Sequence, residues 1–102
     1  MDQFKLSYNK YNYVYQKILT MKETRICQIP KLKSGQKAVK NISWYTQDNV
    51  SVYATMWEPA TSEFAKWEEI TPNTTLSPHV TALKFVNNTS TTRVVIVRLV
   101  VE

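Results

Sequence analysis

Apolar residues dominate the segment 93–101, RVVIVRLVV. Six of its nine residues are β-branched, and it contains neither Gly nor Pro, so the pattern favours a strand over a helix. Alternate side chains of a strand face opposite sides. Val95, Val97, Leu99 and Val101 therefore share one face, and the other face is also apolar except at Arg98. We predict a central strand that is covered on both sides, because an open apolar edge would promote aggregation.

Shorter segments with strand-like patterns precede this one. The predicted strands cover residues 23–29, 38–46, 50–57, 64–70 and 80–87. The alternation is clearest over 50–57, and a helix over 62–70 that begins at Ser62 is the alternative to the fourth strand. Turns rich in Asn, Asp, Ser, Thr or Pro separate the segments, among them the Asn- and Thr-rich turn over 87–92. Several short strands spaced in this way predict an all-β sandwich or barrel.

Residues 1–21 differ from the rest, since they are polar, basic and rich in tyrosine. Tyrosines at every second position from 11 to 15 have the period of a strand, although tyrosines at 8, 11 and 15 also fit one side of a helix. We favour an extended arm or an added strand. Because a lone ribbon is not stable in water, it must lie on its own domain or on a neighbouring chain. The predicted division is an N-terminal arm or added strand, 1–21, and a β-sandwich domain, 22–102.

The net charge of +5 is unevenly distributed. Residues 1–40 hold nine Lys or Arg and two acids, a charge of +7, whereas residues 41–102 hold four bases and six acids, a charge of −2. Such asymmetry often marks a segment that meets an acidic partner. A basic surface exposed to solvent is the alternative.

Cysteine and apolar content exclude several classes of protein. Cys27 is the only cysteine, so no intrachain disulfide can form, and we interpret it as a small buried hydrophobic residue rather than a reactive or intermolecular thiol. No apolar run approaches the ~20 residues of a membrane helix, and residues 1–17 do not have the pattern of a signal peptide. We therefore expect synthesis in a reducing cytoplasm and no membrane partner.

The residues that carry chemistry do not form a recognisable active site. His79 is the only histidine, whereas a zinc site needs about three or four ligands, and we interpret it as a surface loop residue. Glu68 and Glu69 are adjacent, so on a strand they face opposite sides and cannot act as a paired acid and base. The one glycine, Gly35, leaves no Gly-rich phosphate loop and no Gly-x-Ser-x-Gly motif. We expect a protein that is not an enzyme, with no catalytic, cofactor-binding or metal-binding residues.

Basic and aromatic residues interleave in the N-terminal segment. This mixture suits docking on a protein, where Tyr is a preferred contact residue, and also single-stranded nucleic acid, where bases stack on rings and Lys meets phosphate. We favour the protein partner. The predicted partner-binding residues of the arm are Lys5, Tyr8, Lys10, Tyr11, Tyr13, Tyr15 and Lys17.

Three tryptophans lie on consecutive predicted strands. Amphipathic rings can form a platform for a sugar or a protein, or they can fill the core. Trp44 is assigned to the core, whereas Trp57 shares its predicted face with Ser51 and Thr55. The candidate surface platform consists of Tyr53, Trp57 and Trp67.

The C-terminal half carries a family resemblance. Its features are the run from Trp57 through Trp67, then VTALKFVN within LSPHVTALKFVNNTSTTRVVIVRLVVE, a Thr/Asn turn and an apolar final strand. In pattern, it resembles the second half of the small Ig-like sandwiches that serve as accessory or decoration proteins of tailed bacteriophage heads. The resemblance implies a small Ig-like antiparallel β-sandwich of about six to seven strands and a structural role in the virion. No binding residue is carried over, since no motif is specific enough.

We therefore expect a non-enzymatic virion structural protein, an auxiliary capsid protein made in the host cytoplasm. It would dock on capsid or neighbouring subunits, copies of itself included, through its arm and sandwich surface. One alternative is a module that binds carbohydrate or another ligand through exposed Trp and Tyr. The second alternative is a small nucleic-acid-binding protein that uses the basic arm.

Overall fold

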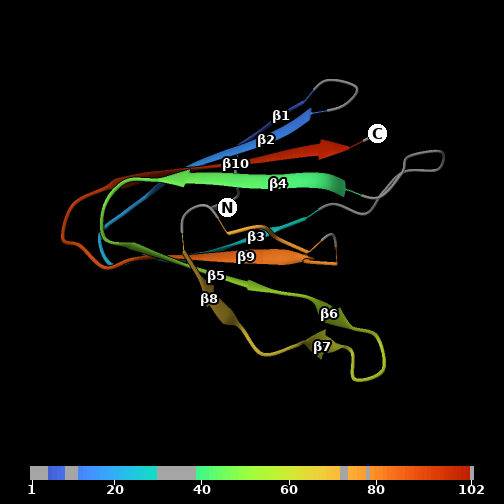
Figure 1. Ribbon diagram of the computed structural model, residues 1–102. Helices are drawn as coiled ribbons and strands as arrows, with labels where there is room; N and C mark the ends of the chain where they lie inside the picture. Colours follow the sequence, from blue (N-terminus) through green and yellow to red (C-terminus); the bar gives the residue numbers. More distant parts are fainter. Residues whose placement is uncertain (1–4, 9–11, 30–38, 72–73, 78, 102) are drawn as a thin grey trace.

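The computed structural model describes residues 5–8, 12–29, 39–71, 74–77 and 79–101. In these ranges the chain is all-β without a helix, and two four-stranded antiparallel sheets face each other as a sandwich (Figure 1). The first sheet has the order β1 (Lys5–Tyr8), β2 (Asn12–Leu19), β10 (Arg93–Val101), β4 (Val39–Thr46). The second has the order β3 (Thr24–Gln28), β9 (Ala82–Asn87), β5 (Val50–Thr55), β8 (Glu68–Ile70). A separate hairpin consists of β6 (Trp57–Glu58) and β7 (Glu63–Phe64).

Strand β10 lies between β2 and β4, so the central position predicted for 93–101 is confirmed. Val95, Val97 and Leu99 are 0% exposed, and burying side chains of this size stabilises a fold by about 1.5–3 kcal/mol each. The prediction that both faces are covered is wrong for the described chain. On the outer face Val94 and Ile96 are only half-buried, because an antiparallel sheet of a two-layer sandwich packs on one side and faces solvent on the other.

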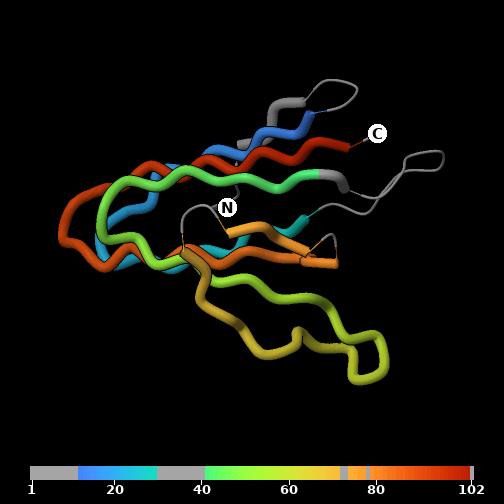
Figure 2. The backbone as a smooth tube through the Cα atoms, viewed as in Figure 1, coloured from blue at the N-terminus to red at the C-terminus, as the bar shows by residue number. Residues whose placement is uncertain are grey.

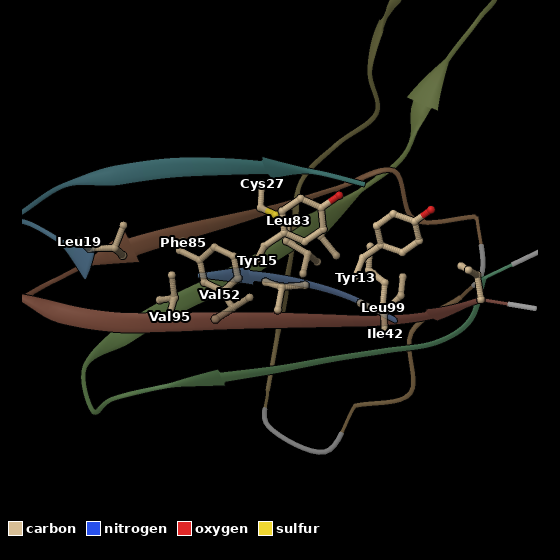
Figure 3. Packing of buried hydrophobic residues seen from close by; sticks show 13 residues of the cluster. Tyr13, Tyr15, Leu19, Cys27, Ile42, Val52, Leu83, Phe85, Val95 and Leu99 are labelled. Carbon is tan, nitrogen blue, oxygen red and sulfur yellow. The ribbon is translucent and has the colours of Figure 1, made fainter. Parts of the chain in front are cut away.

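The core lies between the two sheets and draws side chains from both (Figure 3). Cys27 is 2% exposed, which confirms the interpretation of this cysteine as a buried hydrophobic residue. Trp44 is partly buried and packs against the core, in agreement with its predicted place. The core residues are Tyr13, Tyr15, Leu19, Cys27, Ile42, Val52, Ala54, Leu83, Phe85, Val95, Val97, Leu99 and Val101.

Residues 12–19 form an integral strand of the sandwich. Strand β2 pairs with β10 along its whole length, with Tyr15 opposite Val97 and Tyr13 opposite Leu99. This part of the N-terminal segment is therefore an added strand and not an arm that stands away from the domain. The boundary predicted between residues 21 and 22 falls in the turn between β2 and β3.

Three connections between the sheets lie together at one end of the sandwich, on the left in Figures 1 and 2. They are residues 20–23, 47–49 and 88–92. Adjacent connections are joined by backbone hydrogen bonds, from the Lys22 amide to the Thr89 carbonyl (3.0 Å) and from the Asn88 amide to the Asn49 carbonyl (3.1 Å). This end of the sandwich is therefore closed.

Asn87 is the buried polar residue at the closed end, and it is 1% exposed. Its Nδ2 donates to the carbonyls of Thr20 and Thr91, both at 2.8 Å. Its Oδ1 accepts hydrogen bonds from the amide (2.9 Å) and hydroxyl (2.7 Å) of Thr89. The amide is thus satisfied on both sides, and the Asn- and Thr-rich turn predicted over 87–92 is confirmed.

The segment 56–70 departs from the two strands predicted there. Strand β5 ends at Thr55, and the predicted strand 64–70 is divided into β7, an irregular stretch at 65–67 and β8. The Thr55 hydroxyl donates to the Ala65 carbonyl (2.7 Å), and the Ala65 amide donates to the Met56 carbonyl (2.9 Å). These bonds hold the chain at Ala65 next to the end of β5, so that it folds back over the outside of the second sheet. The helix considered over 62–70 is absent as well.

Replacing Asn87 with Ala should lower the free energy of unfolding by about 3 kcal/mol, because buried carbonyl and amide groups lose their partners. The matched control is Asn88→Ala, whose exposed amide donates one hydrogen bond of 2.8 Å to Ser51. The control should lose less than about 1 kcal/mol. Urea unfolding followed by circular dichroism measures both, and equal losses would contradict the role given to Asn87.

High pH should destabilise the folded protein, because two core residues, Cys27 and Tyr15, ionise more readily in the unfolded chain. Burial raises the pKa of Cys27 to about 12 from its ordinary 9.0, and burial, with smaller effects of Cys27 and Tyr13, raises that of Tyr15 to about 12 from 10.0. Both groups stay neutral in the folded state but ionise in the unfolded chain. The stability they contribute is complete below pH 9 and is lost as the pH rises to about 12.

The loss should reach about 1.4 kcal/mol per pH unit for each group. The free energy of unfolding, measured in urea between pH 8 and pH 12, should fall less steeply for Cys27→Ala than for the unchanged chain. The other titrating residues are common to both proteins, and the smaller effect of Cys27 on the pKa of Tyr15 is lost together with the thiol. Identical slopes would show that Cys27 does not contribute.

Candidate functional site

The structure places the partner-binding residues predicted in the N-terminal segment in different environments. Tyr13 and Tyr15 are 8% and 9% exposed, and their rings lie in the core (Figure 3). They stabilise the sandwich and leave almost no ring surface for a partner. Lys17 is half-buried on β2. Lys5 and Tyr8 lie in β1, whereas Lys10 and Tyr11 lie outside the described residues.

The three residues of the candidate platform come together on the outside of the second sheet, with two further residues between them. The Nζ atom of Lys84 lies 4.8 Å from the ring centroids of both Tyr53 and Trp67. Trp67 contacts Phe64, with centroids 5.5 Å apart, and Phe64 contacts Trp57 at 5.3 Å. We call this row the aromatic strip: Tyr53, Lys84, Trp67, Phe64 and Trp57.

Strand pairing positions the members of the strip. Tyr53 lies opposite Lys84 in the β5–β9 ladder, so both side chains point outward from the second sheet. Trp57 lies opposite Phe64 in the hairpin. The irregular residues 65–67 carry Trp67 back onto the sheet, where its ring meets Lys84.

Sequence reasoning missed Lys84 and Phe64. Lys84 alternates with Leu83 and Phe85 on a predicted strand, so its outward position could be read from the pattern, but its ring partners could not. On the continuous strand predicted over 64–70, Phe64 and Trp67 would face opposite sides, because they are three residues apart. The interruption at 65–67 places their rings in contact instead.

The contacts within the strip connect the β6–β7 hairpin to the second sheet. Each cation–π contact at an exposed site is worth about 0.5–1 kcal/mol, and each aromatic pair about 0.5–1.5 kcal/mol beyond burial. Trp57 nevertheless remains 44% exposed, and its neighbour Met56 is also exposed. The hairpin projects from the body of the molecule at the lower right of Figure 1.

The geometry of the strip limits what it can bind. Lys84 lies over one face of the Tyr53 ring and one face of the Trp67 ring. The planes of Phe64 and Trp57 are nearly perpendicular, at 86°. The strip is therefore a ridge with one exposed indole at its end, rather than a flat platform for the face of a sugar.

Acidic residues lie on the two elements beside the strip. Glu58 and Glu63 lie opposite each other next to the Trp57–Phe64 pair but on the other face of the hairpin, because successive side chains of a strand face opposite sides. On the edge strand β8, Glu69 lies opposite Tyr53. Like charges directly opposite on a hairpin are destabilising, so the Glu58–Glu63 pair does not hold the hairpin together. It gives the hairpin that carries Trp57 a negative charge.

A cavity of about 410 Å³ lies between the segment 65–66 and residues 74–77, 79 and 80, which all contribute to its lining. Its walls are mostly apolar, with Lys66, Glu68 and exposed His79 among the polar residues. The loop position expected for His79 is confirmed. The cavity is lined by Ala54, Thr55, Met56, Ala65, Lys66, Glu68, Ile70, Thr74, Thr75, Leu76, Ser77, His79 and Val80.

Within the ranges that the structure describes, no three His, Cys, Asp or Glu side chains gather as metal ligands. In the same ranges there is no helix of the length and apolarity needed to span a membrane. The search for similar proteins matched no family model, no curated protein and no solved structure. The function is therefore inferred from the fold and from the exposed residues.

Removing the charge of Lys84 should loosen the hairpin. Lys84→Met keeps most of the side-chain length but removes the cation–π contacts, so the free energy of unfolding should fall by about 1–2 kcal/mol and the tryptophan emission should shift to longer wavelength. The control is Lys66→Met, on the exposed stretch beside Trp67. Fluorescence-detected urea unfolding measures both, and equal behaviour would contradict the role of Lys84.

Proposed function

We propose that this chain is a non-enzymatic structural protein that docks on another protein through the aromatic strip, with Trp57 as the anchor. One observation carries the proposal: Trp57 is 44% exposed although its ring is held edge-on against Phe64. Rigid, exposed Trp and Met residues are typical of the centres of protein interfaces, because they bury a large area at little cost in side-chain entropy.

The charge around Trp57 defines the chemistry of the partner. Glu58 and Glu63 give the hairpin that carries the indole a negative charge, on the face opposite to the Trp57–Phe64 pair. A complementary surface has an apolar pocket for the indole with Lys or Arg around it. Opposite charges at the rim of an interface mainly accelerate association, so binding should weaken as salt increases.

The more specific proposal is an auxiliary (decoration) capsid protein of a bacteriophage, with an Ig-like sandwich, acting in the virion. Its support is the resemblance of the C-terminal half, together with the antiparallel two-sheet arrangement. The partner would then be a capsid subunit or a neighbouring copy. Lys5, Tyr8, Lys10 and Tyr11 stay predicted contacts of the N-terminal segment. Deleting residues 1–21 does not test them, because it removes β2 and leaves β10 without one neighbour.

The alternatives find less support in the geometry. A carbohydrate site at Tyr53, Trp57 and Trp67 needs open ring faces, and Lys84 lies over two of these rings. A nucleic-acid site in the N-terminal segment needs exposed rings, and Tyr13 and Tyr15 are buried.

Selection from a displayed library of random peptides tests the docking proposal. We expect selected peptides to carry a large apolar residue next to Lys or Arg. Trp57→Ala should weaken their binding at least about 30-fold, a loss of about 2 kcal/mol. The control is Tyr45→Ala, since Tyr45 is 59% exposed on the opposite sheet and should not matter. Calorimetry measures each affinity.

Two results would overturn the proposal. The first is that no selected peptide depends on Trp57. The second is a tryptophan fluorescence response to soluble glycans that disappears in Trp57→Ala, which would establish the carbohydrate alternative instead.

A further inference from the structure

Strand β4 is an open edge of the first sheet. It is eight residues long, Val39–Thr46, and it pairs with β10 on one side. In the parts of the chain that the structure describes, no strand pairs with its other side. An edge strand carries backbone N–H and C=O groups that can pair with a further strand.

This edge lacks the features that normally prevent such pairing. Residues 41–46, NISWYT, contain no charge, no Pro and no Gly. The register irregularity of the β4–β10 pair falls at Val100 and Val101, so the pairing of 41–46 is regular. The β8 edge of the second sheet is different, because β8 has only three residues and two of them are glutamates. Shortness and charge protect β8, whereas residues 41–46 of β4 form a longer edge that is regular and uncharged.

The β4 edge is complementary to itself. In an antiparallel pair of two β4 strands centred on Ser43, Ile42 lies opposite Trp44 and Asn41 lies opposite Tyr45. Ile42 and Trp44 are on the inner face, where Trp44 is still half-exposed, and the other three residues are exposed on the outer face. The pairing therefore joins apolar to apolar and polar to polar residues, and each favourable cross-strand pair contributes about 0.2–1 kcal/mol.

The nearest like charges do not oppose this arrangement. Arg98 lies opposite Ser43 on β10, so the Arg98 residues of the two copies are three strand spacings apart, about 14 Å. That distance exceeds the Debye length of about 8 Å at physiological salt, so their repulsion is mostly screened.

We propose that two copies of this chain associate through their β4 strands, antiparallel about a two-fold axis at Ser43, and form one continuous eight-stranded sheet. A two-fold axis makes the same edge serve both partners, which is the commonest symmetry of soluble oligomers. The inference does not depend on the docking proposed at Trp57, which lies on the hairpin beside the second sheet. A dimer would carry two such anchors and would bind a repetitive surface more tightly than one copy.

The test is the mass of the full chain by sedimentation equilibrium between about 1 μM and about 1 mM, a range that covers weak to moderate dimers. We expect a concentration-dependent dimer. Ser43→Lys places two ammonium groups opposite each other at the axis and should raise the dissociation constant at least ten-fold. The control is Gln16→Lys, which adds the same charge at an exposed position on β2, away from the edge, and should leave the dimer unchanged.

Ser43→Cys provides a geometric check. Paired strands bring the two introduced thiols close enough for a disulfide, so mild oxidation should yield a covalent dimer, whereas Gln16→Cys should not cross-link. Native Cys27 is buried and does not compete. The proposal is overturned if the chain stays monomeric up to about 1 mM, or if a dimer survives Ser43→Lys and Ser43→Cys does not cross-link. Trp57→Ala should leave the dimer intact, which separates this proposal from the docking function.

Discussion

The burial of one face of β10 against the second sheet is the constraint on which the rest of the structure depends. Val95, Val97 and Leu99 are fully enclosed, and β10 pairs with β2 on one side and β4 on the other. Because side chains opposite each other in a ladder face the same way, this burial also decides which residues of the neighbours point inward. Tyr13 and Tyr15 therefore enter the core, and Tyr45 points to solvent.

A buried polar residue, Asn87, adds to the apolar core by fixing the turns at one end of the sandwich. Asn87 ends β9, and its amide joins the turn after β2 to the turn before β10. A buried amide that satisfies all its partners specifies one arrangement of these turns, whereas an apolar contact would tolerate several. The sandwich is thereby closed at one end. The hairpin β6–β7 lies outside the two sheets and needs the aromatic strip to hold it.

Two surfaces remain available for partners, and they differ in chemistry. The aromatic strip presents an exposed indole on an acidic hairpin, which suits an apolar pocket with basic surroundings. The β4 edge presents neutral backbone and side chains, which suit an identical strand. The two surfaces lie on different sheets, so one molecule could use both at once.

The sequence by itself determined most of the strands, because alternation with period 2 is a local property of the chain. The extent of β10, the set of its residues that share one face, the burial of Cys27 and the turn at 87–92 all follow from neighbouring residues. Only the tertiary structure decided which tyrosines are buried, since their facing depends on the register with β10. It also decided the break at 65–67 and the place of Lys84 between Tyr53 and Trp67. Those features arise from contacts between residues that are distant in the chain, and local patterns do not encode such contacts.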